Sequence, residues 1–172
     1  MRIETHRLLL RHFEISDLRD VHEYCRQPGI GEMAGWKHHP TLNYTRGILL
    51  LWIIEGCRFA VVYKPENRVI GHVTVNYDND GDKTVRDLGF VLNRDYHHQG
   101  IMSEIAGPVI EELKKEGIRR LTASCYQDNE NSRRLLERIG FHLSGEGKFY
   151  SYGTGLVEDT YLFRMDLVAR EK

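Results

Sequence analysis

The sequence has little net charge, few cysteines and no long run of apolar residues. Its 24 lysines and arginines nearly balance 25 aspartates and glutamates, which gives a formal net charge of −1 at pH 7. A chain without a strong positive field has no electrostatic reason to bind nucleic acid or an anionic membrane as its main partner. We therefore expect no nucleic acid and no membrane among its partners.

The three cysteines, Cys25, Cys57 and Cys125, are far apart and have no metal-ligand spacing. An odd number of scattered cysteines does not form a disulfide framework. We expect small buried thiols in a reducing compartment, and no metal site. The first residues show no signal-peptide pattern and no apolar run approaches the length of a membrane span, so we expect a cytoplasmic protein.

The length and composition fit one well-packed globular domain. The chain has 172 residues, of which 41% are hydrophobic and 28% charged, and both fractions are ordinary for such a domain. No linker, internal repeat or low-complexity segment divides it. We expect a single domain over residues 1–172.

Hydrophobic periodicity predicts alternating strands and helices. Ser16 and Asp17 suit a helix N-cap, and the helix over 43–56 is too apolar to lie on an open surface. A parallel crossover next to an antiparallel meander predicts a mixed α/β sheet. The expected helices cover 18–25, 43–56, 101–116 and 129–139, and the expected strands cover 2–12, 57–64, 68–77, 83–92, 119–126, 141–150 and 157–168.

The stretch 87–104 predicts an anion site. A strand there leads into a loop whose Gly100 immediately precedes the apolar-periodic run that starts at Ile101. A helix N-terminus presents unpaired backbone N–H groups to an anion, and glycine permits close approach or a positive φ. An ordinary turn would also place a glycine here. The carboxyl ends of adjacent parallel strands favour ligands, and this rule places the loop and the helix start at Asn129 on one rim.

Three segments carry a resemblance to a known family. They are ETHRLLLRHFEISDLRD at 4–20, HHQGIMSE at 97–104 and NENSRRLLERIGF at 129–141. They resemble the start T-x-R-L-x-L-R, the pyrophosphate loop Gln/Arg-x-x-Gly-x-Gly/Ala followed by Thr/Ser-Glu, and the segment N-x-x-S-x-x-x-x-E-K-x-G-F. These are motifs of the ribosomal-protein N-terminal acetyltransferases, a branch of the GNAT superfamily of acyl-CoA N-acyltransferases. The tail from Gly145 to Tyr161 fits as well, so the resemblance spans nearly the whole chain.

The resemblance implies a fold and an activity. The implied fold is a GNAT-type α/β (α+β) fold. Its mixed, mostly antiparallel sheet has six to seven strands, about four flanking helices and a splay between the fourth and fifth strands, 83–92 and 119–126. Gly89 fits a bulge at this splay. The implied reaction transfers an acetyl group from acetyl-CoA, a cosubstrate, to a primary amine by direct attack in a ternary complex, without a metal. The implied acceptor is a protein N-terminal α-amine, such as that of a ribosomal protein.

The resemblance also implies site residues. Ser132 is expected to protonate the leaving thiolate, because Leu136 occupies the place where many GNAT enzymes have a tyrosine. Asp87, Glu104 and His72 are candidate bases, and Asn129 is expected to hydrogen-bond the pantetheine as a catalytic-site residue. The residues expected to contact CoA are Phe90, Val91, Leu92, His97, His98, Gln99, Gly100, Ile101, Met102, Ser103, Asn129 and Ser132. Those expected to bind the acceptor are Trp36, His38, His72 and Tyr150, with Tyr152 beside them.

Several of these residues have simpler structural interpretations. Asn129 suits a helix cap, Glu104 the first turn of a helix, and Trp36 the anchor of a loop. His97 and Met102 stand where the family usually has Gln or Arg and Gly or Ala, so a non-catalytic acyl-CoA-binding sensor is a second hypothesis. A small-molecule amine, such as an amino acid, a polyamine or an antibiotic, is the alternative acceptor. The sequence leaves the oligomeric state open, a homodimer included.

Overall fold

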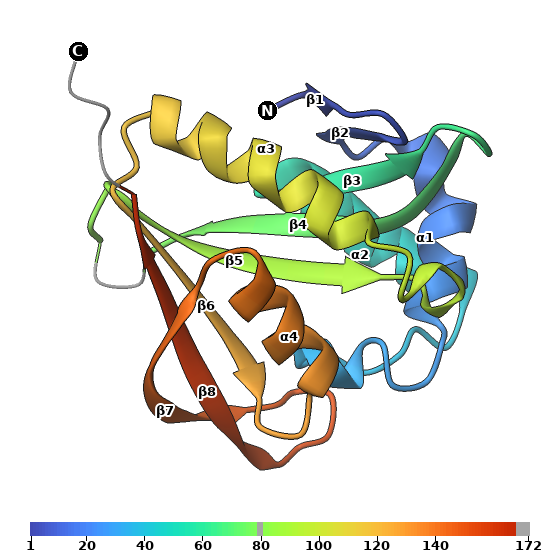
Figure 1. Ribbon diagram of the computed structural model, residues 1–172. Helices are drawn as coiled ribbons and strands as arrows, with labels where there is room; N and C mark the ends of the chain where they lie inside the picture. Colours follow the sequence, from blue (N-terminus) through green and yellow to red (C-terminus); the bar gives the residue numbers. More distant parts are fainter. Residues whose placement is uncertain (79–80, 168–172) are drawn as a thin grey trace.

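An open eight-stranded sheet forms the centre of the computed structural model, which describes residues 1–78 and 81–167 (Figure 1). Neighbouring strands are antiparallel except for the parallel pair β5 and β6. The fold is therefore the mixed, mostly antiparallel sheet that the sequence predicts. Across the sheet the strands are β1 (Ile3–Glu4), β2 (Leu8–His12), β3 (Arg58–Tyr63), β4 (Arg68–Tyr77), β5 (Val85–Leu92), β6 (Arg120–Tyr126), β8 (Val157–Asp166) and β7 (His142–Tyr150).

The strand count differs from the prediction at the N-terminus. Residues 2–12 form a hairpin rather than one strand, because the chain turns between Thr5 and Leu8, where the Thr5 N–H donates to the Leu8 carbonyl (2.9 Å). No glycine or proline marks this turn, and the leucine run after it suggested one continuous strand. At the other end, position 168 of the last predicted strand lies outside the described residues.

Two pairs of helices cover the two faces of the sheet (Figure 1). α1 (Leu18–Cys25) and α2 (Leu42–Glu55) pack on one face, and α3 (Ile101–Lys115) and α4 (Glu130–Arg138) on the other. Short 3-10 turns precede or follow them: η1 (Ile15–Asp17), η2 (Glu32–Ala34) and η3 (Arg94–Tyr96). Across residues 1–78 and 81–167, no helix has the length and apolar character needed to cross a membrane.

Each face of the sheet has its own hydrophobic cluster. The apolar stripe of α3, including Ile105 and Val109, packs with the strand residues Leu10 and Leu121. The opposite cluster is built around α1 and α2 and includes Trp52. Fully burying one large aliphatic side chain contributes about 1.5–3 kcal/mol. The sheet therefore has a buried apolar layer on each of its two faces.

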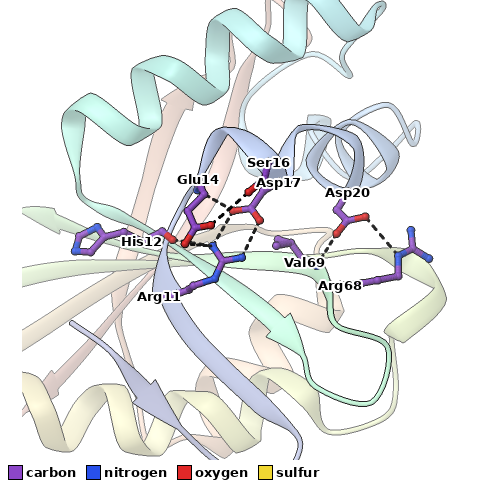
Figure 2. Close-up of polar contacts among 8 residues, drawn as sticks. All are labelled: Arg11, His12, Glu14, Ser16, Asp17, Asp20, Arg68 and Val69. Atoms are coloured by element: carbon purple, nitrogen blue, oxygen red, sulfur yellow. Dashed lines mark hydrogen bonds and ion pairs between the residues drawn. The ribbon is translucent and has the colours of Figure 1, made fainter.

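Charged side chains fasten α1 to the sheet (Figure 2). The Arg11 guanidinium donates two hydrogen bonds of 2.8 Å to Asp17, which also accepts the Glu14 N–H (2.8 Å). Asp20 accepts the Val69 N–H of β4 (3.0 Å). Asp17 therefore occupies the N-cap position of α1 as expected, but its carboxylate binds β2 and η1 and makes no capping bond to α1.

The outer side of α2 contradicts the expectation that its apolar residues avoid open surface. Leu49 and Trp52 are buried against the sheet, but Leu51 is 53% exposed and Ile54 is 80% exposed. α2 is apolar on all sides, whereas one helix in a two-layer packing buries only one stripe. The prediction was wrong for the stripe that faces away from the sheet.

The parallel strands β5 and β6 separate after a short paired segment. Their register holds for three pairs, the last of which is Asp87↔Thr122, and then the strands diverge (Figure 1). The ladder between β4 and β5 continues through Gly89 without a register shift, so the expected bulge at Gly89 is absent from it. The splay between β5 and β6 is confirmed. It opens at the end of the sheet where α3 and α4 begin.

Candidate functional site

A cleft of about 940 Å³ opens where β5 and β6 separate. The starts of α3 and α4 and the loop around η2 complete its walls. Segments far apart in the sequence therefore meet in one place. Of the residues expected at the site, the cleft is lined by Trp36, His72, Asp87, Phe90, Val91, Leu92, His97, His98, Gly100, Ile101, Met102, Ser103, Asn129 and Ser132.

The backbone of β5 presents an unpaired edge to this cleft. The Val91 carbonyl points toward β4, because it lies 2.2 Å from the position that a Cβ on Gly71 would take. The Asn93 N–H also points toward β4 and donates to Ile70 (2.7 Å). Backbone groups alternate sides along a strand, so those of Phe90 and Leu92 face the gap. The Phe90 N–H therefore points toward the cleft, whereas the Val91 N–H points toward β4.

The loop before α3 has the geometry of an anion site. Gly100 is the N-cap residue of α3, with a left-handed φ of +72° and without a side-chain cap. The first intrahelical bond runs from the Glu104 N–H to the Gly100 carbonyl (3.0 Å). The N–H groups of residues 101–103 therefore precede the helical ladder, at the positive end of the helix dipole. They are suited to hold a phosphate.

The Met102 side chain does not obstruct this loop. It is 6% exposed and belongs to the core cluster beneath α3. Its Cε lies 3.2 Å from the position that a Cβ on Gly71 would take, which places the side chain over β4. Only the backbone of residue 102 is therefore available to a ligand. A methionine at this position is compatible with anion binding.

The residues before Gly100 shape the loop through their own contacts. The His97 ring is within 3.0 Å of the Leu92 carbonyl, so its Nε2 carries a proton and ties the loop to the end of β5. His98 is exposed and has a left-handed φ of +59°. Gln99 donates through its side chain to Asp95 (3.1 Å) and does not line the cleft.

The start of α4 lies across the cleft from β5. Asn129 caps this helix, because its Oδ1 accepts the Ser132 N–H (3.1 Å). Ser132 lies beside the thiol of Cys125, a buried cleft residue on β6. Burial raises the pKa of Cys125, and the nearby Ser132 hydroxyl opposes the increase. The sequence predicted a small buried thiol here but not its contact with Ser132.

Asp87 lies at the apex of the cleft, in the last residue pair before the strands separate. Burial raises the pKa of its carboxyl group above the ordinary value, although the hydrogen bond from Thr122 (3.1 Å) opposes this effect. A carboxylate with a raised pKa is a better base than an exposed one. Asp87 also borders a second, smaller hollow of about 370 Å³ beside Asn76 and Tyr77.

The opposite end of the cleft is aromatic. The turn at 151–156 packs on the loop around η2, where the Gly153 N–H donates to Gly35 (3.1 Å). A Cβ on Gly153 would come within 2.6 Å of the Trp36 backbone, so only glycine permits this approach. The Tyr126 hydroxyl, beside Gly35 and Phe149, is buried and has no hydrogen-bond partner among the described residues. No motif marks Tyr126, so its place in the site could not be predicted from the sequence.

His72 connects the cleft to the core under α2. Its Nδ1 is 3.0 Å from the Tyr24 hydroxyl, and its ring packs at a tilt against Trp52, with 4.8 Å between centroids. Burial, with a smaller contribution from the Arg58 charge, lowers the pKa of His72 to about 3. His72 is therefore neutral at physiological pH and is a weak base.

Four other expected residues lie outside the cleft lining. His38 pairs with Glu32, with 2.7 Å between Nδ1 and Oε1. Tyr150 and Tyr152 are exposed and pack edge to face, with 5.2 Å between ring centroids. Glu104 points toward the N-terminal hairpin, where the Arg7 Nε donates to its carboxylate (2.7 Å). In residues 1–78 and 81–167, no three His, Cys, Asp or Glu side chains gather closely enough to hold a metal ion.

Comparisons with known proteins agree with this geometry. Residues 7–142 match the family model described as Acetyltransferase (GNAT) domain. The protein named "Uncharacterized N-acetyltransferase YnaD", from Bacillus subtilis (strain 168), is 30% identical over 151 residues, which are 84% of this chain and 85% of that protein. The ribosomal-protein-serine acetyltransferase of Escherichia coli (strain K12) is 26% identical over 124 residues, 72% of this chain and 68% of that one.

A solved structure shows the same fold. It is RimL, a ribosomal L7/L12 alpha-N-protein acetyltransferase in complex with coenzyme A, in which the coenzyme forms a disulfide with a cysteine. The two chains superpose with a TM-score of 0.83 at 21% identity, and the match covers 98% of this chain and 99% of RimL.

Proposed function

Because the chain belongs to the GNAT acetyltransferase family and is an N-acetyltransferase, we propose that it transfers an acetyl group from acetyl-CoA to a primary amine. One observation carries the proposal. A single cleft combines the free N-terminus of α3, the unpaired edge of β5 and the start of α4. These three features meet the needs of a diphosphate, a peptide-like pantetheine arm and a leaving thiolate.

The cosubstrate binds along β5 in this proposal. The N–H groups of Ile101, Met102 and Ser103 hold the diphosphate at the positive end of α3. The amides of the pantetheine pair with the free backbone groups of Phe90 and with the Leu92 N–H, as an added strand would, while the Leu92 carbonyl keeps its hydrogen bond to His97. Asn129 hydrogen-bonds the same arm from the opposite wall while it caps α4.

The acetyl group is transferred by direct attack. The amine nitrogen forms a bond to the carbonyl carbon, the carbon–sulfur bond breaks, and the thiolate gains a proton as the amine loses one. The Phe90 N–H polarises the carbonyl oxygen. Ser132 donates the proton to the sulfur, since it lies in the cleft wall one turn into α4.

The amine must be neutral when it attacks. An N-terminal α-amine, with a pKa of about 7.7–8.0, is neutral at roughly the ten-per-cent level at pH 7, whereas a lysine amine with a pKa of about 10.4 is almost entirely charged. A modest base therefore suffices for an α-amine. Asp87, with its raised pKa, is the residue that we assign to this role.

The proposed acceptor is a protein N-terminal α-amine, such as that of a ribosomal protein. The names of the Escherichia coli relative and of RimL support this class. A small-molecule amine is the second candidate, because the aromatic end of the cleft is bridged by the Gly153–Gly35 hydrogen bond. Because this hydrogen bond spans the end of the cleft, only a narrow group can enter there. Both the terminus of a protein chain and a small amine are narrow enough.

A free-thiol assay tests the proposal. Acetyl-CoA is mixed with peptides that have a free or a blocked N-terminus, and with amino acids and polyamines, while thiol release and product mass are followed. We expect rapid thiol release with at least one amine, and about 100-fold less with Ser132→Ala, while acetyl-CoA affinity stays nearly constant. Ser144→Ala on exposed β7 is the matched control. Failure of every amine to accelerate thiol release would contradict the proposal.

A further inference from the structure

A hydrogen-bond network joins the N-terminal hairpin to the first turn of α3. The Glu104 carboxylate accepts the Thr5 hydroxyl (2.6 Å), the Arg7 N–H (3.0 Å) and the Arg7 Nε (2.7 Å). The Arg7 Nη2 also donates to the Gln99 carbonyl (3.0 Å). Arg7 therefore holds both the first turn of α3 and the loop that precedes it.

Glu104 creates an electrostatic problem for the site. A helix N-terminus attracts negative charge of any origin, so a carboxylate in the first turn competes with a bound diphosphate and repels it. Burial raises the pKa of Glu104, but the hydrogen bonds from Thr5 and Arg7 outweigh burial and hold this pKa below its ordinary value. Glu104 is consequently charged at neutral pH, and a neighbouring cation is needed to offset its effect.

Arg7 is placed to provide that cation. Its Nη2 lies 3.9 Å from the position that a Cβ on Gly100 would take, directly beside the loop. Its bond to the Gln99 carbonyl also draws that oxygen toward the hairpin. A carbonyl oxygen turned toward a diphosphate would repel it, whereas the N–H groups that follow attract it.

We infer that Arg7 is a positioning residue for the diphosphate of CoA, acting by neutralising Glu104 and by fixing the orientation of the 97–100 loop. The inference rests on the proposed function. It also gives Glu104 a role other than that of a base. Three donors occupy its carboxylate, and the side chain lies outside the cleft lining.

CoA binding and donor choice together test this role. Calorimetry measures the CoA dissociation constant of the wild type, Arg7→Gln, Glu104→Gln and the double variant. Arg7→Gln is expected to weaken CoA binding about tenfold or more. Transfer from S-acetylpantetheine, which lacks the diphosphate, should keep its KM and kcat. An equal loss with both donors would show a general structural defect and would overturn the inference.

The double variant isolates the charge effect. Removing the Glu104 charge in the Arg7→Gln background should recover part of the lost CoA affinity, and the loss that remains measures the absent bond from Arg7 to the Gln99 carbonyl. Arg7→Lys keeps the charge and should bind CoA nearly as well as the wild type. This variant still tests the inference if Arg7→Gln fails to fold. A double variant no better than Arg7→Gln, or an Arg7→Lys variant that binds poorly, would overturn the inference.

Lys64→Gln is the matched control. Lys64 anchors the same hairpin through Glu4 (3.0 Å) and the Thr5 carbonyl (2.6 Å), but it has no hydrogen bond to Glu104 or to the loop. It should leave CoA affinity unchanged, and an equal loss in this variant would contradict a specific role for Arg7. If the wild type itself binds no CoA, the proposed function fails. If the wild type and Arg7→Gln bind CoA equally well, only the present inference fails.

Discussion

At the scale of single residues, a substitution at Tyr126 should affect the stability of the protein and its activity in different ways. Its buried hydroxyl lacks a partner in the described part of the chain, and a buried polar group without a hydrogen bond costs free energy. Such a group at the aromatic end of the cleft is suited to bind a polar atom of the acceptor.

We expect Tyr126→Phe to keep or raise the free energy of unfolding by up to about 1 kcal/mol. It should lower kcat/KM for the acceptor about tenfold, because the hydrogen bond to the substrate is lost. Denaturant unfolding and steady-state kinetics measure the two effects. Lower stability with unchanged acceptor kinetics would show that the hydroxyl serves the fold instead.

Asp87 gives a prediction that depends on pH. Its pKa is raised on folding by burial, so the folded state favours the protonated form. The free energy of unfolding of the wild type therefore falls, relative to that of Asp87→Asn, as the pH rises. The fall begins near the unfolded-state pKa of about 3.8 and continues through the raised pKa of the folded state. Below this window the carboxylate is protonated in both states, and Asn confers no pH-linked advantage.

The same variant should lose activity. If Asp87 accepts the amine proton, Asp87→Asn lowers kcat about 100-fold and removes the acidic limb of the pH–rate profile. Unfolding experiments between pH 3 and 8, together with kinetics over the accessible range, check both parts. A variant that keeps its acidic limb would exclude Asp87 as the base.

At the scale of elements, the contact between β4 and β5 fixes the edge that faces the cleft. A Cβ on Gly71 would lie 2.2 Å from the Val91 carbonyl, a distance that no side chain tolerates without moving the backbone. Glycine at this position lets the two strands pair closely.

Gly71→Ala should therefore lower the free energy of unfolding by about 3 kcal/mol. Gly47→Ala, within α2, is a control of opposite sign. A Cβ there meets no atom within 4 Å, so the helix should gain about 0.5–1 kcal/mol. Thermal and denaturant unfolding of the two variants measure the difference. A neutral Gly71→Ala would show that the strands separate more easily than their packing indicates.

Sequence patterns predicted most elements because their signals are local. The period of apolar residues gave α3, and Gly100 marked its start. The hairpin at 2–12 was missed because its turn is stabilised by Glu104, nearly a hundred positions away. The exposure of Leu51 and Ile54 was also missed, because periodicity in an all-apolar helix does not show which stripe faces the sheet.

At the scale of the whole molecule, the candidate site was predictable where a motif carried it. The loop at 97–103 and the segment from Asn129 to Ser132 do line one cleft, and among their residues only Gln99 and Glu130 lie outside its lining. Tyr126 and the Ser132–Cys125 contact depend on how distant elements meet, and Arg7 acts through a loop far from it in sequence. Tertiary packing, rather than local pattern, determines these positions.

Calorimetry of acetyl-CoA binding to the wild type and to Gly100→Val tests whether the loop before α3 holds the cosubstrate. Valine strongly disfavours the φ of +72° at position 100, so this substitution should distort the loop. Gly117→Val is the matched control, since it imposes the same strain at φ +87° at the other end of α3, with no atom within 4 Å of its Cβ.

We predict a micromolar dissociation constant for the wild type and for Gly117→Val, and no measurable binding by Gly100→Val. Absence of binding by the wild type, or equal binding by all three proteins, would contradict the assignment of the α3 loop as the cosubstrate site.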